Sequence, residues 1–283
     1  SWPTLLGYFG TTPYSNIGEV DNKGIELSLN WRKEIIKDLN VDLRANLTYN
    51  KNKYVYYDEP NYEAVWKKKT GQPLSISWGY IADGYFQNQE EIDNGPDQTG
   101  LGSQLKPGDI KYRDVNGDGI INDDDKVMLS SFGSMPRIQY GLGLNLTYKK
   151  IDFGVFFNGS AQRKIMINNA MTDFGERNKN VMKCIADDHW SIDNPNPEAT
   201  FPRLGLKSTD IKNNTEASSH WLRNGNFIRF KTLEVGYSFP HCRVYFSGDN
   251  LAVWSPFKLW DPELSWNAYP LQRTFNFGVQ LNF

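Results

Sequence analysis

The residues best placed to do chemistry lie in one acidic stretch, Asp114–Asp125 (DVNGDGIINDDD). A calcium loop supplies oxygen ligands from positions 1, 3, 5, 7, 9 and 12, with a glycine at the sharp turn of position 6. Gly119 stands at that turn. The candidate ligands are Asp114, Asn116, Asp118, Ile120 through its carbonyl, Asn122 and Asp125. The spacing predicts a structural Ca²⁺ site.

This loop departs from an EF-hand in two respects. Asp125 stands where an EF-hand has glutamate, and no helical pattern flanks the loop, which therefore looks closer to the calcium loop of dockerins. Asx side chains also stabilise turns without metal, so a metal-free turn is the alternative. If metal binds, we expect it to stiffen an outer loop.

No pattern typical of catalysis accompanies the acidic loop. Asp187–Trp190 (DDHW) sets carboxylates beside His189, but neighbours in a polar loop do not meet the geometric test for acid–base catalysis. The sequence holds no HExxH, GxSxG, P-loop or Rossmann motif. Cys184 and Cys242 show no metal-ligand spacing, and a net charge of −2 gives no reason to expect nucleic acid. We therefore do not expect an enzyme.

The elements that would position such a loop are strands. The end of the chain alternates strictly between apolar and polar residues, with Asn276, Gly278, Gln280 and Asn282 on the polar face. Its apolar face is expected to contact lipid and consists of Phe275, Phe277, Val279, Leu281 and Phe283. A terminal aromatic residue resembles the signal that bacterial outer-membrane barrels present to their assembly machinery.

The same alternation recurs along the chain. It runs through 25–31, 41–49, 142–148, 151–157 and 233–239, and it starts again at Val244. The interleaved residues are rich in Asn, Thr, Ser, Gly and Gln, whereas a soluble sandwich would place Lys and Glu there. Aromatic residues make up 14% of a chain whose mean hydropathy is −0.60. Together these features predict an all-β, antiparallel transmembrane barrel with a wet lumen.

Connection lengths provide an independent check on the barrel. If Phe283 ends in the periplasm, the short connections at Lys33–Lys37, Lys149–Lys150 and Pro240–His241 all fall on the periplasmic side. The long connections, at about 54–136, 161–225 and 255–270, all fall outside. Short turns inside and long loops outside are typical of these barrels. We expect 54–136 to form an extracellular excursion that contains the calcium-type loop 114–125.

Several longer motifs resemble one family. They are NIGEVDNKGIELSLNW (16–31), GQPLSISWGYIADGYFQNQEEI (71–92), PGDIKYRDVNGDGIINDDDK (107–126), NFIRFKTLEVGYSFP (226–240), RVYFSGDNLAVWS (243–255) and RTFNFGVQLNF (273–283). The chain looks like the C-terminal part of a SusC/RagA-type TonB-dependent transporter of the Bacteroidetes outer membrane. The resemblance spans nearly all of residues 1–283.

The resemblance implies a barrel of 22 strands with a plug domain in its lumen. It also implies contact with the TonB complex, a SusD-like surface lipoprotein that covers the outer loops, and import of oligosaccharides or oligopeptides. We expect the plug and the TonB-contacting segment to lie outside this chain. About seven predicted crossings also fall far short of 22, so this chain alone cannot close such a barrel. The join at Pro240–His241 is also shorter than the family leads one to expect.

Aromatic residues in the outer loops are candidates for recognition. Tryptophan faces stack on sugars or peptides, although an interfacial belt or loop core is the alternative. We expect Trp190 and Trp260 to contact the ligand or the lipoprotein lid. Two other functions remain open: a soluble all-β carbohydrate-binding or carbohydrate-active protein with a dockerin-like loop, and a barrel that serves as an adhesin or structural pore.

Overall fold

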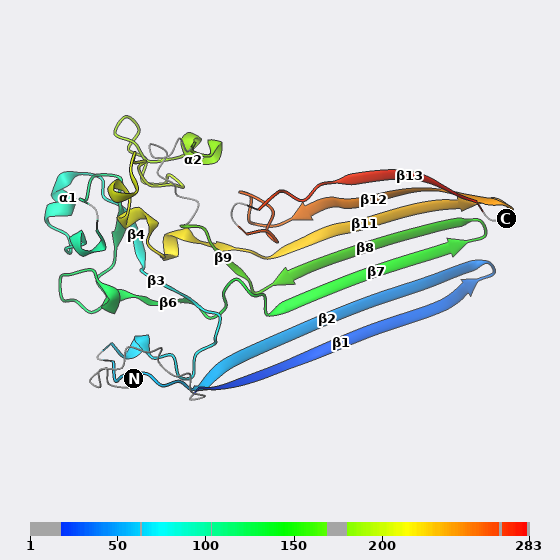
Figure 1. Cartoon of the computed structure of the whole chain (residues 1–283), viewed down its shortest axis with the longest axis horizontal. Helices are drawn as coiled ribbons and strands as arrows, with labels where there is room; N and C mark the ends of the chain where they lie inside the picture. Colours follow the sequence, from blue (N-terminus) through cyan, green and yellow to red (C-terminus); the bar gives the residue numbers. More distant parts are fainter. Residues whose placement is uncertain (1–17, 63, 103, 169–179, 266–267, 282–283) are drawn as a thin grey trace, which may run out of the picture.

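The chain folds into a long antiparallel sheet with a compact group of loops at one end (Figure 1). The computed structural model describes residues 18–62, 64–102, 104–168, 180–265 and 268–281. Phe283, the last of the expected lipid-facing residues, lies outside this range. No helix in the described ranges is long and apolar enough to cross a membrane.

In the described ranges the sheet wall contains seven strands in the order β1-β2-β7-β8-β11-β12-β13, each antiparallel to its neighbours. Consecutive strands of the wall are therefore neighbours in space, as in an up-and-down barrel. The strands are β1 (Glu19–Ile36), β2 (Leu39–Tyr56), β7 (Ile138–Tyr148), β8 (Ile151–Ala161), β11 (Phe227–Ser238), β12 (Cys242–Trp254) and β13 (Thr274–Leu281).

One face of the sheet wall is apolar and exposed. The alternate residues expected to face lipid project from it: Phe275 is 58% exposed, Phe277 84%, Val279 63% and Leu281 58%. No second sheet covers them among the described residues, as a soluble sandwich would require. We call this side the lipid face and the opposite, polar side the lumenal face.

The connections confirm the expected asymmetry. All three short turns lie at one end of the sheet, and the long connections lie at the other (Figure 1). One boundary was wrong: β1 does not end before Lys33 but continues to Ile36, so the turn is Lys37–Asp38. Lys33 pairs with Val41 inside the strand, because a lysine near the membrane rim can extend its ammonium group into water. At the third turn, Phe239–His241 joins β11 to β12, with a hydrogen bond from Phe239 N to Cys242 O.

The long connections fold together into what we call the loop unit. Its described residues form three two-stranded sheets and two short helices, and its 3₁₀ turns include η3 (Asp123–Asp125) in the predicted calcium loop. The sheets pair β3 (Ser77–Gly79) with β6 (Val127–Ser130), β4 (Ala82–Tyr85) with β5 (Ile110–Tyr112), and β9 (Lys164–Met166) with β10 (Leu222–Asn224). The helices are α1 (Gln89–Asp93) and α2 (Lys183–Asp187).

A single hydrophobic core holds the loop unit together. It combines residues of three long connections, among them Tyr80, Ile110, Ile185, Trp221 and Phe257. The core of this chain therefore lies outside the sheet wall, whose apolar residues point outward. This is the reverse of a soluble β-protein and suits a barrel whose outer surface meets lipid.

Candidate lumenal binding surface

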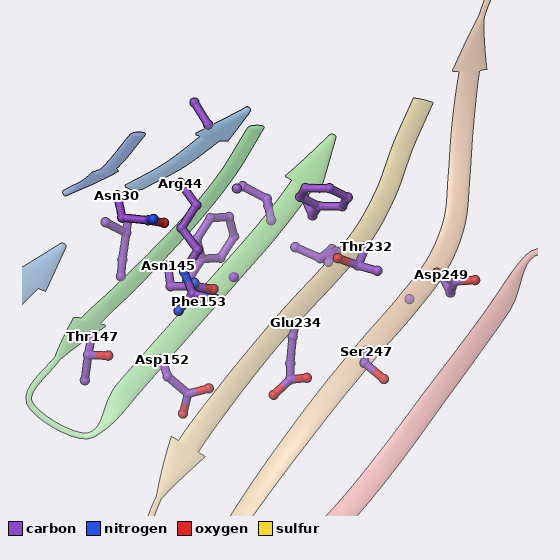
Figure 2. A pocket seen from close by; sticks show the side chains of 18 of the residues that line it. Asn30, Arg44, Asn145, Thr147, Asp152, Phe153, Thr232, Glu234, Ser247 and Asp249 are labelled. Carbon is purple, nitrogen blue, oxygen red and sulfur yellow. The ribbon is translucent and has the colours of Figure 1, made fainter. Parts of the chain in front are cut away.

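The lumenal face of the sheet wall is a broad polar hollow of about 750 Å³. Alternate positions of the wall strands supply it, because successive side chains of a strand point to opposite faces. Figure 2 shows these side chains projecting on the same side of the ribbon. The labelled polar residues are Asn30, Arg44, Asn145, Thr147, Asp152, Thr232, Glu234, Ser247 and Asp249.

Ion pairs cross the strands on this face. Arg243 Nε donates to Asp152 Oδ1 at 3.0 Å, and Arg243 Nη2 donates to Glu234 Oε1 at 2.6 Å. Gly236 makes room for them, since a Cβ there would lie 2.5 Å from Arg243 Nη2. These side chains are partly exposed, so the network contributes little to stability and mainly sets the charge pattern of the lumen.

Nearer the loop unit, the hollow continues into a smaller cavity of about 530 Å³, which we call the mouth. Its lining includes Asn46, Gln139, Asn158, Ser160, Arg163 and Glu263. Asn158 Oδ1 and Ser160 Oγ are buried and have no hydrogen-bond partner among the described residues. Since a buried polar atom without a partner costs free energy, these oxygens mark a place where a ligand can bond.

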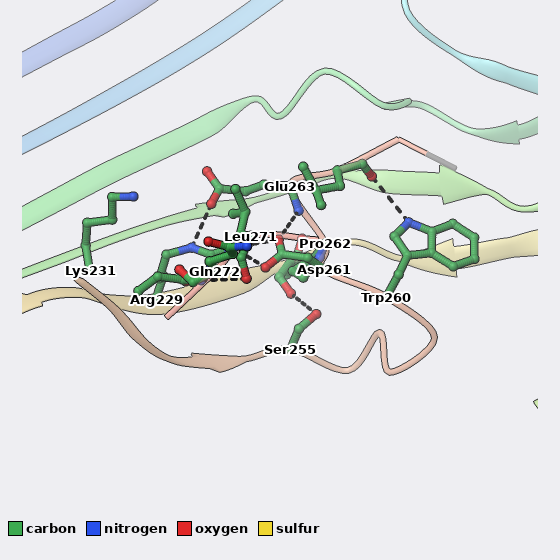
Figure 3. Close-up of polar contacts among 12 residues, drawn as sticks. Arg229, Lys231, Ser255, Trp260, Asp261, Pro262, Glu263, Leu271 and Gln272 are labelled. Atoms are coloured by element: carbon green, nitrogen blue, oxygen red, sulfur yellow. Dashed lines mark hydrogen bonds and ion pairs between the residues drawn. The ribbon is translucent and has the colours of Figure 1, made fainter. Parts of the chain in front are cut away.

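A buried arginine shapes one side of the mouth (Figure 3). The Arg229 side chain of β11 is 1% exposed. Its Nη2 donates to both carboxylate oxygens of Asp261, at 2.6 and 2.8 Å, and its Nε donates to Glu263 Oε2 at 2.7 Å. Arg229 also bonds Asn250, whose Nδ2 donates to the carbonyls of Leu271 and Gln272. Arg229 thus binds the 255–265 segment directly. Through Asn250 it also links this segment to residues 271–272, which precede β13.

The 255–265 segment also contacts Arg163, another residue of the mouth. Arg163 donates to the carbonyl of Pro262 and, at 2.8 Å, to that of Ser134. Burial lowers the pKa of Arg163, while the carboxylates of Asp261 and Glu263 oppose this shift. The mouth therefore presents cationic and anionic groups beside the two unpartnered oxygens.

The two candidate tryptophans occupy different environments. Trp190 is only 2% exposed and packs in the loop-unit core, where its Nε1 donates to Gln87 Oε1 at 3.4 Å. Its ring therefore has almost no surface for a ligand, and it acts as a packing residue here. Trp260 is partly buried, stands edge-on to Phe257 at 4.7 Å, and donates from Nε1 to Leu264 O. The predicted contact of Trp260 with the ligand or the lipoprotein lid stays a prediction.

The predicted calcium ligands form a compact loop, but their oxygens bond to the backbone. Asp114 accepts hydrogen bonds from Gly117 N at 2.6 Å and Gly119 N at 2.7 Å, and the Gly119 bond is the main reason that the pKa of Asp114 is lowered. Asp125 is fully buried and accepts from Val115 N and Asn122 N. Backbone N–H groups of the loop thus satisfy these carboxylates.

The other predicted side-chain ligands form Asx turns, in which each accepts from the N–H two residues further along the chain. Asp118 Oδ1 accepts from Ile120 N, and Asn122 Oδ1 accepts from Asp124 N. Asn116 Oδ1 accepts from Asp118 N. In the described part of the chain, no group of three or more His, Cys, Asp or Glu is arranged to hold a metal. The calcium site stays a prediction.

A buried polar cluster joins two long connections inside the loop unit. Asp109 is fully buried, and Arg203 Nε lies 2.6 Å from its Oδ1. Asn214 Nδ2 donates to the same carboxylate at 2.8 Å. Burial raises the pKa of Asp109, and Arg203 only partly offsets this. These contacts fix the fold of the loop unit, because Asp109 comes from one long connection and both Arg203 and Asn214 come from another.

A histidine is also enclosed in the loop unit. His220 Nε2 lies 3.3 Å from the Tyr85 hydroxyl, and its ring meets Trp221 edge-on at 4.6 Å. Burial, together with the positive charge of Arg223, lowers the pKa of His220 to about 4. His220 is therefore neutral in the folded protein at neutral pH.

Sequence reasoning did not single out Asn158, Ser160, Arg163 or Arg229. The polar-face alternation places Asn158 and Ser160 in the lumen but says nothing about their hydrogen-bond partners. Arg229 stands in a strand whose register shifts between Phe230 and Thr232. Such a β-bulge re-aims side chains and is not visible as a simple period of two.

Known proteins match this sequence over almost its whole length. The chain is 30% identical to TonB-dependent receptor P26 of Formosa agariphila over 303 residues, which covers 95% of this chain and 30% of that receptor. It is 28% identical to TonB-dependent receptor SusC of Bacteroides thetaiotaomicron, covering 97% of this chain and 28% of that receptor. The chain thus spans less than a third of the length of these relatives. No protein-family model matches it.

Solved structures share its fold. A structure of the RagAB peptide transporter superposes with a TM-score of 0.66 at 22% identity, covering 99% of this chain and 31% of that one. A structure of the RagAB peptide importer in the "open-open" state gives 0.67 at 21% identity, covering 95% of this chain and 29% of that one. At this identity the likeness concerns the fold alone.

These relatives are receptors and transporters rather than enzymes. The seven antiparallel wall strands fit a C-terminal portion of their barrels, and the exposed lipid face fits an outer-membrane location, which argues against the soluble alternative. The chain belongs to the SusC/RagA-type family of TonB-dependent outer-membrane transporters.

Proposed function

We propose that this chain forms wall and outer loops of an active importer that takes an oligosaccharide or oligopeptide across the outer membrane. The observation that carries the proposal is the pair of buried, unpartnered oxygens of Asn158 and Ser160 at the mouth. Both residues line the mouth, next to a lumen lined with Asn, Thr, Ser and charged groups. A polar ligand on its way through the lumen is the natural partner for such oxygens.

The chemistry of the mouth suits an uncharged or zwitterionic oligomer. Asn158 Oδ1 accepts a hydrogen bond, and the Ser160 hydroxyl both donates and accepts. Sugar hydroxyls and peptide amides satisfy both groups. Arg163 and Glu263 on the same lining add one charge of each sign, so neither a strongly cationic nor a strongly anionic ligand is favoured.

The proposed importer works with two protein partners. A SusD-like surface lipoprotein covers the loop unit and delivers ligand, and Trp260 is a candidate contact residue for it. Energy comes from TonB acting on a plug domain outside this chain. The names of the relatives support these assignments, since one is SusC and two solved structures are of RagAB.

We further propose that the 114–125 loop binds Ca²⁺ weakly and that the ion stiffens the loop unit. Asp114, Asn116, Asp118, the Ile120 carbonyl, Asn122 and Asp125 would hold the ion. Calorimetry of the full-length protein in millimolar CaCl₂ tests this, at the affinity of roughly 10⁻⁴–10⁻³ M typical of extracellular sites. Binding heat that an Asp118→Ala variant abolishes is expected; equal heats, or none, refute the site.

Ligand binding at the mouth is tested with a double variant, Asn158→Ala/Ser160→Ala, in the full-length transporter. Each lost hydrogen bond is worth about 1 kcal/mol, so affinity should fall about 25-fold when both are removed. Asn40→Ala/Ser238→Ala is the matched control, because it makes the same two changes near the short turns. Calorimetry against oligosaccharide and oligopeptide panels gives affinity and substrate class together.

Two outcomes decide the proposal. Loss of affinity in the mouth variant alone, with slower growth on the bound nutrient, supports it. Unchanged affinity in the mouth variant, for a nutrient that the unaltered transporter binds, shows that the unpartnered oxygens have another role.

A further inference from the structure

The short-turn end of the sheet wall carries a cluster of lysines that transport does not explain. Lys37 belongs to the β1–β2 turn, and Lys149 and Lys150 form the β7–β8 turn. Lys33 lies near the end of β1, on the face that also carries Trp31. All four side chains are exposed.

The two lysine-bearing turns are directly joined. Lys149 N donates a hydrogen bond to Asp38 O at 3.1 Å, and Leu39 of β2 is paired with Tyr148 of β7. The lysines of both turns therefore occupy one continuous surface. Figure 1 shows the two turns at the same end of the sheet, opposite the loop unit.

Strand register places this surface just beyond the last apolar row of the lipid face. Cross-strand pairing runs from Ile36 through Leu39, Tyr148, Ile151, Tyr237 and Val244 to Val279. Most of these side chains are at least 38% exposed, and Tyr237 stacks near Phe239 at 4.7 Å. Aromatic residues at the end of an apolar face mark the boundary between hydrocarbon and headgroups. Lys37, Lys149 and Lys150 follow that boundary immediately, and Lys33, which pairs with Val41, lies one row before it.

The charge of the cluster is only partly balanced. The ion pairs of the described residues include none of Lys33, Lys37, Lys149 or Lys150. Three acids are close in sequence, Glu34, Asp38 and Asp152. Asp152 is already paired with Arg243, and Glu34 Oε1 accepts a hydrogen bond from Asp38 N. Four ammonium groups against the two remaining carboxylates leave the surface cationic.

We propose that this surface, Lys33, Lys37, Lys149 and Lys150, binds the headgroup phosphate of an anionic phospholipid in the periplasmic leaflet of the outer membrane. Short turns of such barrels face the periplasm. The Lys149 ammonium lies 5.3 Å from the Tyr148 ring centre, which holds it at the rim. Acyl chains would cover the row of apolar residues above, and the ammonium groups would pair with the phosphodiester below.

Native mass spectrometry of the full-length protein, titrated with phosphatidylglycerol or phosphatidylcholine, tests the proposal. Lysines near an anionic surface contribute about fivefold each to binding, so Lys149→Gln/Lys150→Gln should weaken phosphatidylglycerol binding about 25-fold. Lys149→Arg/Lys150→Arg keeps the charge and should keep the affinity. Lys51→Gln/Lys53→Gln removes the same charge from the opposite end of β2 and should change nothing.

Each result has a fixed meaning. Preference for phosphatidylglycerol that only the Lys149→Gln/Lys150→Gln variant loses supports the site. Equal retention of the two lipids, or equal loss in the control at Lys51 and Lys53, overturns it. The arginine variant separates a folding defect from lost charge, because a misfolded turn would lose binding in both turn variants.

Discussion

Arg229 should control whether the 255–265 segment stays folded against the lumen. Replacing it with glutamine removes the paired bonds to Asp261 and the bond to Glu263, which are 2.6 to 2.8 Å long. Breaking a fully buried ion pair costs about 3–5 kcal/mol. The carboxylates of Asp261 and Glu263 are 14% and 36% exposed, so water compensates part of the loss. We expect a cost of about 2–3 kcal/mol.

This cost should appear as local opening rather than global unfolding. Phe257 remains anchored in the loop-unit core, and Ser255 Oγ still donates to Asn226 O. A loss of 2–3 kcal/mol raises the open population about 30- to 150-fold. Hydrogen exchange followed by mass spectrometry should therefore show that protection of peptides covering 255–265 falls by the same factor, about 30- to 150-fold, while protection of β12 and β13 is unchanged.

A nearby charge provides the control for Arg229. Lys231, two residues along β11, lies 3.8 Å from Asp249, and both side chains are well exposed. Such a pair is worth at most about 1 kcal/mol, so Lys231→Gln should change protection less than about fivefold. If protection of 255–265 is the same in Arg229→Gln as in Lys231→Gln, Arg229 does not hold the segment and the reasoning fails.

Three further perturbations follow from the packing and charge of named residues. His220 is kept neutral in the fold but becomes protonated in the unfolded chain at acid pH. The free energy of unfolding of the loop unit should therefore fall by about 2–3 kcal/mol as pH drops from 6.5 to about 4. In urea titrations His220→Gln should lose this pH-dependent part of the stability. Gly108→Ala should cost the loop unit about 2–4 kcal/mol in the same assay, since φ is +89° and a Cβ would lie 2.1 Å from the Trp190 ring. Phe277→Arg should destabilise the assembled barrel by about 2–4 kcal/mol in lipid vesicles, whereas Asn276→Arg on the lumenal face should be tolerated.

Each of these predictions has its own contradicting result. An identical pH slope in the wild type and the histidine variant would show that another group titrates. Gly71 has the same φ of +89° but open space around it, so a loss at Gly71→Ala equal to that at Gly108→Ala would mean that the tryptophan contact is unimportant. Equal destabilisation at Phe277 and Asn276 would mean that the two faces do not meet different solvents.

Much of the sheet wall could be predicted from local pattern. The alternation at 142–148 and 151–157 matches β7 and β8 closely, and the Lys149–Lys150 turn falls where expected. The first two strands were predicted too short, since β1 and β2 each run for 18 residues. Beyond the apolar stretch these strands carry Lys, Asn and Tyr without a strict alternation, because neither face is buried there. The backbone nevertheless stays hydrogen-bonded in the sheet.

The loop unit was much less accessible to sequence reasoning. Its core residues are scattered over three connections, and its polar partners lie far apart in sequence, as with Asp109 and Arg203. Trp190 shows the consequence. A loop tryptophan suggested ligand contact, but the fold buries its ring against Gly108.

The sequence by itself determined that alternate residues form one apolar and one polar face, because a strand's side chains must alternate whatever surrounds them. It also determined which connections are short and which are long. Only the tertiary structure decided which polar residues are left without partners at the mouth, that Arg229 holds a loop, and that two lysine-bearing turns touch. Those properties depend on strand register and on contacts between distant segments, which no local pattern encodes.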